Sequence, residues 1–340
     1  MKKLFYTLSG SNGASYIINT SSLKDIRESL KFYKARTFKQ KVQKSLFIAY
    51  VFLFKNQLKS LEEVNKYLES LSSCKIDFHL SKTSSVLVSP TRDKVIVHHH
   101  DCFFEKFAFG KSYANVKREA EIYKLLERDF HYFEVSKMYD RVETGEYCSF
   151  KLSSIRKYIP NKQDLTLALV EFFSVTLQKD VLLKEQIESI IKTCKNHTEI
   201  VTILNTLKEE KAHATIALGL VHRDFKPWNI KDDKGLLIFD FEEAIQNGLP
   251  LEDMFNYTID PVIRYEDTIK VVEKIFDAKM IQEYRRYLNL LEINVDFFVL
   301  LNLYLAQRVL FWEAVGEIET SKVYAALFNC INTSEFSYER

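Results

Sequence analysis

One stretch of this 340-residue chain concentrates side chains that can do chemistry, and it reads Leu220-Val221-His222-Arg223-Asp224-Phe225-Lys226-Pro227-Trp228-Asn229-Ile230. Asp224 is an acid on a tight loop, and Asn229 offers an amide carbonyl five residues later. A turn at Asp232–Gly235 folds the chain back before Asp240, which ends a short apolar run. Asp240 can therefore lie beside Asn229, and two such oxygen ligands suit Mg²⁺. Asp224 is then left to accept a proton from an attacking hydroxyl.

The motif H-R-D-F-K-P-W-N at 222–229, followed by I-F-D-F-E at 238–242, resembles the catalytic and metal-binding loops of a known family. This family is the protein-kinase-like small-molecule phosphotransferases, which include aminoglycoside phosphotransferases, choline kinases and enzymes of bacterial polysaccharide clusters. The run G-L-P-L-E-D at 248–253 is similar to a segment that follows the metal aspartate in these enzymes. The resemblance therefore covers both loops and the segment after them.

The resemblance implies a role for each motif residue. Asp224 would be the catalytic base, and Asn229 and Asp240 would bind Mg²⁺. Lys226 would reach the transferred phosphate, while the two remaining motif residues, His222 and Asp253, would brace the loops. Arg223 and Lys226 also match the protein-kinase version of the motif. The motif therefore leaves open whether the chain resembles the small-molecule kinases or the protein kinases more closely.

Helical geometry predicts a buried ion pair upstream of these loops. Advancing 100° per residue from Val116 places Glu119 among apolar side chains, where an ionised carboxylate is costly without a partner. On the preceding strand, Lys106 is likewise a charge on a mostly apolar face. A Lys106–Glu119 pair would satisfy both, and in the family such a pair holds the nucleotide phosphates. Lys111 is the alternative lysine, and a surface lysine beside an unrelated glutamate is the other interpretation.

The phosphate-covering turn departs from the family pattern, because the chain has only 8 glycines and none lies between Gly13 and Gly110. The turn at 89–94 reads S-P-T-R-D-K. The hydroxyls of Ser89 and Thr91, or a neighbouring basic side chain, would have to replace glycine N–H groups at the phosphates. The backbone near Ser153, in the expected connection between the lobes, would meet the adenine.

An α+β fold of the two-lobed protein-kinase-like type is expected. Residues 1–80 form an N-terminal extension that is largely helical and basic, with short strands before residue 20 and a helical stretch over Ser22–Leu71. Residues 81–155 form the nucleotide-binding N-lobe with a small antiparallel sheet. Residues 156–340 form a helical C-lobe that carries both loops.

Residue patterns place the elements within these lobes. Strands are expected at about 86–88, 94–100, 102–109, 134–142 and 147–155, and a helix at 112–126. Later segments include helices at about 164–179, 182–194 and 198–218, a hairpin at 229–240, and long helices from about 267 onward.

Composition excludes several classes of protein. A hydrophobic fraction of 46% and a charged fraction of 28% exclude wholesale disorder, and a net charge of +2 argues against a nucleic-acid partner. Neither a dinucleotide fingerprint nor a P-loop motif occurs. The five dispersed cysteines form no C-x-x-C pair, and the longest apolar run, Leu46–Phe54, is too short to span a bilayer. A soluble cytoplasmic protein is expected.

Two features have competing interpretations. The acid-free basic stretch Lys31–Lys59 is either a solvated helix face or a surface for anionic lipid or a phosphorylated substrate, which leaves peripheral membrane contact open. The triplet His98–His100 sends successive side chains to opposite faces of a strand, so three imidazoles cannot bind one metal ion.

The predicted function is transfer of the γ-phosphoryl group of ATP, with Mg²⁺, to a hydroxyl of a small molecule, such as a sugar, a glycan precursor or a lipid-linked glycan. Phe241-Glu242 stands where a protein kinase has Phe-Gly, no A-P-E motif follows, and the stretch from Asp240 to Asp253 is too short for an activation segment. A protein Ser/Thr kinase and a catalytically inactive pseudokinase-type binding module remain the alternatives.

Overall fold

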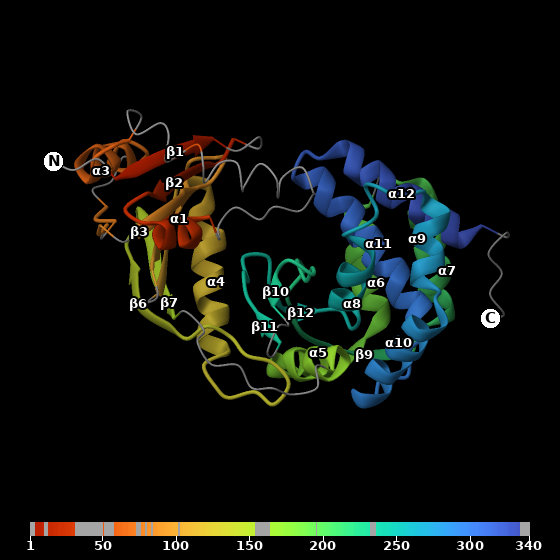
Figure 1. The fold of residues 1–340 in the computed structure, drawn as a ribbon. Helices are drawn as coiled ribbons and strands as arrows, with labels where there is room; N and C mark the ends of the chain where they lie inside the picture. Colours follow the sequence, from red (N-terminus) through yellow and green to blue (C-terminus); the bar gives the residue numbers. More distant parts are fainter. Residues whose placement is uncertain are drawn as a thin grey trace. The chain divides into compact units, whose positions relative to one another are not determined.

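The computed structural model describes residues 4–9, 13–30, 50, 58–72, 76–78, 80–82, 84–100, 103–153, 164–194, 196–231 and 236–333 (Figure 1). The chain divides into two compact units. The first, called the sheet unit, comprises Met1–Glu127 and Ser136–Lys157; the second, called the helical unit, comprises Arg128–Val135 and Tyr158–Arg340. A large antiparallel sheet dominates the first and helices dominate the second, so the predicted α+β class is confirmed.

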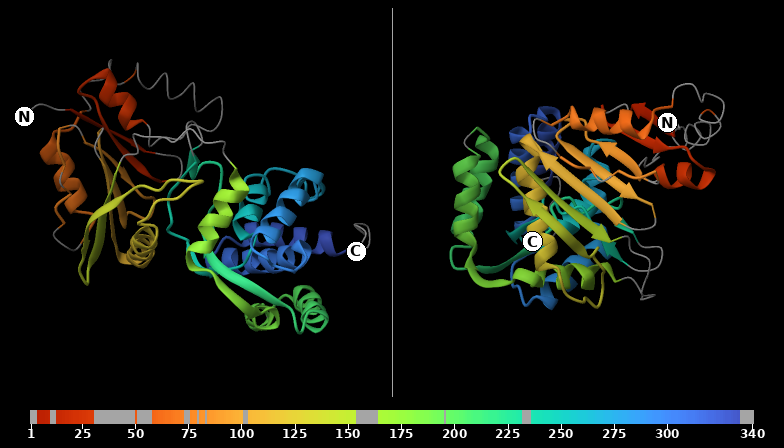
Figure 2. Two further views of the ribbon diagram at one scale, coloured as in Figure 1. Left: turned by 90° about the horizontal axis from the view of Figure 1, so that it is seen from below. Right: turned by 90° about the vertical axis from the view of Figure 1, so that its left-hand side faces the viewer.

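The sheet unit contains a 7-stranded antiparallel sheet in the order β1-β2-β3-β4-β5-β7-β6, whose strands run side by side in Figure 2. Its strands are β1 (Phe5–Ser9), β2 (Ser15–Asn19), β3 (Ser84–Val88), β4 (Lys94–His99), β5 (Phe103–Phe109), β6 (Met138–Glu143) and β7 (Tyr147–Ser153). Its helices are α1 (Leu23–Ser29), α3 (Leu61–Glu69), the short 3₁₀ turn η2 (Gly110–Ser112) and α4 (Tyr113–Leu125).

The two faces of β5 pack against different partners, because successive side chains alternate in a strand. Phe107 and Phe109 join a core cluster with Val64 and Leu68 of α3. Lys106, directly before Phe107, points to the other face and reaches α4. The sheet is therefore covered by α3 on one side, while α4 meets the face that carries Lys106.

The N-terminal strands belong to the same sheet as the strands of the expected N-lobe, since β2 pairs with β3 through Ile17 and Val86. The expected helical stretch over Ser22–Leu71 is wrong at Lys59, which forms a β-bridge with Phe5. The capping box of Ser60 then starts α3 anew. Most of the basic stretch Lys31–Lys59 lies outside the described residues.

The helical unit contains eight α-helices within its described residues. They are α5 (Leu165–Phe173, followed by the 3₁₀ turn η3, Ser174–Thr176), α6 (Leu183–Thr193), α7 (Thr198–Glu210), α8 (Glu252–Ile259), α9 (Thr268–Ile275), α10 (Ala278–Leu290), α11 (Phe297–Ala314) and α12 (Ile318–Asn332). Its short strands are β8 (Gln178–Leu182), β9 (Thr215–Val221), β10 (Ile230–Lys231), β11 (Leu237–Ile238) and β12 (Ile245–Gly248).

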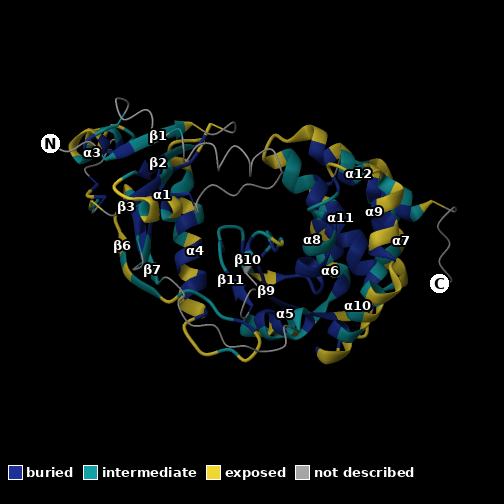
Figure 3. Cartoon of the chain, viewed as in Figure 1, coloured by how far each residue is buried: buried dark blue, intermediate teal, exposed yellow. Residues whose placement is uncertain are grey.

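Helix α11 is the central helix of this unit. By length and composition it could cross a membrane, but 61% of it is buried inside the protein. Figure 3 shows much of α11 in the colour of buried residues. Helix α12 packs along it, and α6, α7 and α8 contact it as well. These contacts are those of a core helix, because they bury its apolar side chains against other helices.

The predicted helix over 198–218 ends early, because its last part is the buried strand β9 at the centre of the order β12-β9-β8. The strand contains Gly219, which lies opposite Gly248 of β12. A Cβ on Gly219 would collide with the carbonyl of Phe173, and one on Gly248 would collide with Val221. Two glycines therefore let β12 and the end of α5 approach the strand that leads into the H-R-D motif.

Candidate active site

The loop after β9 is fixed by a buried acid. The backbone N–H groups of His222 and Arg223 donate to the Asp253 carboxylate, to Oδ2 at 2.7 Å and to Oδ1 at 2.9 Å. Asp253 lies in the first turn of α8. Burial raises the pKa of Asp253 to about 6, although the neighbouring His222 and these N–H bonds act in the opposite direction. The aspartate of the G-L-P-L-E-D run thus holds the backbone of the H-R-D motif.

The His222 side chain connects this loop to β11. The ring is completely buried and packs on Phe225 and Phe241. Its Nδ1 accepts from the Asp224 N–H at 3.3 Å, and its Nε2 donates to the Phe239 carbonyl at 3.0 Å. This pattern requires the tautomer with hydrogen on Nε2. His222 therefore ties Asp224 to the residue just before Asp240.

Two residues of these loops have a left-handed backbone, namely Arg223 with φ 61° and Asp240 with φ 73°. Such values are uncommon outside glycine and cluster at functional sites. Arg223 is held there by Glu252, whose Oε1 lies 3.0 Å from its Nε.

Asp224 is positioned by an amide and an ammonium. Asn229 Nδ2 donates to the Asp224 backbone carbonyl at 2.9 Å and to its Oδ2 at 2.6 Å. Lys226 Nζ pairs with Oδ1 of the same carboxylate. The Asp224 side chain still remains 31% exposed. It is thus an oriented carboxylate that solvent can reach.

The hairpin β10–β11 brings the two predicted metal-binding residues to neighbouring backbone positions. Ile230 pairs with Ile238, and the Phe239 N–H donates to the Asn229 carbonyl at 3.3 Å. Asp240 follows directly. Because Nδ2 of Asn229 is used by Asp224, the orientation of the amide is fixed and Oδ1 is its remaining ligand atom. The donor set fits Mg²⁺, which prefers oxygen.

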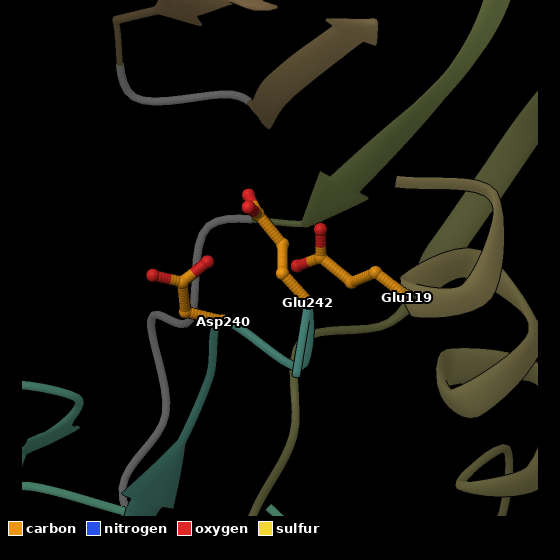
Figure 4. Close-up of side chains that lie close together, drawn as sticks. All are labelled: Glu119, Asp240 and Glu242. Atoms are coloured by element: carbon orange, nitrogen blue, oxygen red, sulfur yellow. The ribbon is translucent and has the colours of Figure 1, made fainter. Parts of the chain in front are cut away.

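Figure 4 shows a further carboxylate on this segment, that of Glu242, two residues after Asp240. In this view both carboxylates project to the same side of the segment. The sequence motifs assign no chemical role to Glu242, although a second acid so close to Asp240 is a signal that the sequence contains.

A residue that the sequence reasoning missed completes the site. Asp260, at the C-cap of α8, has Oδ2 3.2 Å from Lys226 Nζ, and its side chain is only 2% exposed. No motif marks it, because it meets Lys226 only through the packing of α8.

In the sheet unit, the expected ion pair is present. Lys106 Nζ lies 2.6 Å from Glu119 Oε2, and the side chains are 7% and 0% exposed. Lys106 lies opposite Ile96 of β4 and Phe150 of β7. The alternative lysine, Lys111, is exposed. Apolar burial on both sides thus brings the two opposite charges together.

The turn between β3 and β4 uses its hydroxyls internally. The Ser89 and Thr91 hydroxyls both donate to Asp93 Oδ1, the former at 3.4 Å. Ser112 donates to the same carboxylate, through its backbone N–H to Oδ2 at 3.0 Å and through its hydroxyl to Oδ1 at 2.8 Å. Burial opposes ionisation of Asp93, but these hydrogen bonds outweigh it and lower its pKa. Asp93 is the organiser of this turn, and the sequence reasoning missed it.

Ser153 ends β7 and is tied to Lys137. Its N–H donates to the Lys137 carbonyl at 2.8 Å, and its hydroxyl accepts from the Lys137 N–H at 2.9 Å. Residues 154–163, which contain the rest of the expected connection, and the turn at 232–235 lie outside the described residues. The adenine contact at Ser153 stays a prediction.

The histidine triplet behaves as the alternation of a strand requires. His99 Nε2 lies 3.5 Å from Glu105 Oε2, whereas His100 Nδ1 lies 3.1 Å from Asp25 Oδ1. Neighbouring histidines thus meet different acids.

Comparisons with known proteins give no match to a family model and no match among curated proteins. Solved structures are similar over most of the chain. The GDP and kanamycin complex of APH(2")-IIia has 11% identity, covers 81% of this chain and 100% of its own, and has a TM-score of 0.48. A glucosamine kinase in complex with glucosamine, ADP and inorganic phosphate has 12% identity, coverages of 97% and 90%, and a TM-score of 0.41. The aminoglycoside phosphotransferase APH(3'')-Id from Streptomyces rimosus has 11% identity, coverages of 72% and 92%, and a TM-score of 0.37.

Proposed function

We propose that this protein is an ATP- and Mg²⁺-dependent phosphotransferase that acts on a hydroxyl group of a small molecule. The observation that carries the proposal is the geometry around Asp224. Its carboxylate is oriented by Asn229 and Lys226, is reachable by solvent, and lies on a loop tied through His222 to the residue before Asp240. An oriented base beside two oxygen ligands is what phosphoryl transfer requires.

Each residue has a proposed task. Asp224 accepts the proton of the attacking hydroxyl, and the Lys226 ammonium stabilises charge on the transferred phosphoryl group. Oδ1 of Asn229 and the carboxylate of Asp240 would hold Mg²⁺. When bound, the ion would neutralise charge on the nucleotide phosphates.

The nucleotide is assigned to residues of the sheet unit. Lys106, oriented by Glu119, would bind the α- and β-phosphates, and the backbone at Ser153 would meet the adenine. Ser89 and Thr91 would contact phosphate oxygens. For that they must exchange their hydrogen bonds to Asp93 for bonds to phosphate.

A small-molecule acceptor is favoured over a protein by the segment after Asp240. It forms strand β12, which pairs with β9, and helix α8 begins at Glu252. Such a compact segment is too short for a regulatory activation loop. We propose a sugar, a glycan precursor or a lipid-linked glycan as the acceptor, and a cytoplasmic location with peripheral membrane contact.

The test is direct. The purified protein would be incubated with γ-labelled ATP and MgCl₂, in parallel with a panel of sugars, phosphorylated sugars and aminoglycosides and with generic protein substrates. Label should pass to a member of the small-molecule panel, and the Asp224→Asn variant should transfer it far more slowly. Label in the protein substrates alone would establish a protein kinase instead.

A binding module without catalysis is the second candidate, and the turn at 89–94 favours it. Its hydroxyls are occupied by Asp93, and the described part of the turn offers no glycine N–H to a phosphate. Under this candidate, calorimetry would detect Mg²⁺-dependent binding of ATP, whereas no acceptor and no released phosphate would be found.

A further inference from the structure

The Lys226 ammonium lies between two carboxylates. Its Nζ pairs with Oδ1 of Asp224 and lies 3.2 Å from Oδ2 of Asp260. The two partners differ in access, since the Asp224 side chain is 31% exposed and the Asp260 side chain 2% exposed. Lys226 therefore connects a solvent-accessible acid to a buried one.

Asp260 is itself fixed by two helices that carry no motif residue. The hydroxyls of Tyr304 and Tyr324 both donate to Oδ1, the former at 2.9 Å. Arg308 donates to Oδ2 at 2.9 Å. With Lys226, four donors from three parts of the chain converge on this carboxylate, so its position is determined by the packing of α8, α11 and α12.

The arginine in this group is held equally firmly. The Arg308 guanidinium is stacked over the rings of Phe311 at 4.8 Å, Trp312 at 5.1 Å and Tyr324 at 5.6 Å. Burial lowers the pKa of Arg308, but the nearby Asp260 and tyrosines outweigh it and raise the pKa overall. Arg308 thus remains a cation that holds the Asp260 carboxylate in place.

The consequence for Lys226 follows from charge. An ammonium with Asp224 as its sole partner would follow that half-exposed carboxylate when it moves. A second, buried anion holds the ammonium at a fixed place. The arrangement contains two carboxylates and two cations, which limits the cost of burying it.

We propose that Asp260 is a positioning residue that fixes the Lys226 ammonium against Asp224. Asp260 is in turn held by its donors on α11 and α12. The inference rests on the proposed function for its catalytic consequence, since Lys226 is assigned to the phosphoryl group. Asp260 itself touches neither substrate nor metal in this scheme.

The first test needs no activity. Urea unfolding would be measured for the wild type, Lys226→Met, Asp260→Asn and the double variant. If Asp260 holds Lys226, the double variant is less destabilised than the sum of the single variants, because each substitution removes the same contact. Strictly additive shifts in the unfolding midpoint would overturn the inference, whether or not the protein transfers phosphate.

The second test separates positioning from mere stability. With Mg²⁺·ATP and the acceptor found in the labelling panel, or with water as acceptor, Asp260→Asn should lower kcat about 10- to 100-fold, the scale expected when a catalytic group is misplaced. The KM for ATP should change less than about 2-fold, as when an interaction specific to the transition state is lost. In a Lys226→Met background, Asp260→Asn should have no further effect on kcat.

Two companion variants keep this test interpretable if Asp260→Asn folds poorly. Tyr324→Phe removes one donor to Asp260 but keeps the ring on Arg308, so it should lower kcat in the same direction by a smaller factor. Asp267→Asn removes an exposed carboxylate seven residues further along and should leave kcat unchanged. An active wild type whose folded Asp260→Asn and Tyr324→Phe variants keep full kcat would overturn the inference and leave the proposed function intact. An inactive wild type with a non-additive stability cycle would contradict the proposed function and leave the inference on Asp260 intact.

Discussion

Lys106 and Lys226, one in each unit, have different surroundings. Lys106 in the sheet unit pairs with Glu119 at 2.6 Å, and neither side chain has much exposure. Lys226 in the helical unit is shared by Asp224 and Asp260, and one of these acids is open to solvent. The first arrangement is a closed pair, whereas the second is an open network.

The difference predicts which property each site depends on. When one member of a closed buried pair is removed, an uncompensated charge remains, and the loss appears mainly as stability. When the exposed member of a shared network is removed, Lys226 keeps Asp260 and stability changes little. The catalytic rate is then the property that decreases.

The largest expected effect tests the open network. Asp224→Asn should lower kcat about 10²–10⁴-fold, the usual contribution of a general base. The urea unfolding midpoint should stay close to that of the wild type, because Lys226 retains its buried partner. Phosphate release from labelled ATP and urea unfolding would be measured on the same preparation. A large loss of stability in this variant would break the comparison.

The closed pair should respond in the opposite sense. Glu119→Gln should cost about 3–5 kcal/mol of the free energy of unfolding, because the buried Lys106 would lose the opposite charge of Glu119. Urea unfolding measures this loss. Replacing both residues, by Lys106→Met and Glu119→Leu, should restore most of the stability but abolish nucleotide binding, as measured by calorimetry. A double variant as unstable as Glu119→Gln would contradict the closed-pair interpretation.

The sequence predicts one of these arrangements and not the other, for a physical reason. Glu119 stands out because a single helix places it among apolar side chains, and Lys106 stands out because a single strand does the same. Both signals are local periodicities. Asp260 meets Lys226 only after three helices have packed, and no spacing in the sequence encodes that contact.

The same distinction holds for the fold. The strands from residue 84 to 109 and helix α4 follow from alternating or helical patterns in their own residues, and they are confirmed. The first part of strand β9 falls within the helix predicted over 198–218, because its apolar run T-I-A-L-G-L-V has no period of its own. Its strand character comes from its position between β8 and β12.

The buried acid Asp253 extends the comparison to the pH dependence of stability. Asp253 is held by backbone N–H groups, and burial raises its pKa from an ordinary 3.8 to about 6. A carboxyl group with a raised pKa in the folded state stabilises the protein below the unfolded pKa, and this contribution is lost as pH rises through the folded value. Between pH 4 and pH 6 the wild type should therefore lose about 2 kcal/mol relative to Asp253→Asn.

The measurement is urea unfolding of both proteins at intervals across this pH range. The absolute stability of Asp253→Asn should be lower at pH 4, since an amide has one acceptor for the two N–H groups of His222 and Arg223. The informative quantity is the change of the difference with pH. A difference that stays constant from pH 4 to pH 6 would show that the Asp253 carboxyl group titrates in its ordinary range.

The smallest expected effect concerns Lys111, the other lysine considered in the sheet unit. Lys111→Ala, which removes an exposed side chain near the start of α4, should leave the affinity for Mg²⁺·ATP within about 2-fold of the wild type. Lys106→Ala, assayed in parallel, should lose binding because its ammonium is the group assigned to the phosphates. Equal losses from both substitutions would mean that general positive charge attracts the nucleotide. A loss confined to Lys106→Ala would mean that the closed pair presents the Lys106 ammonium to the phosphates in one orientation.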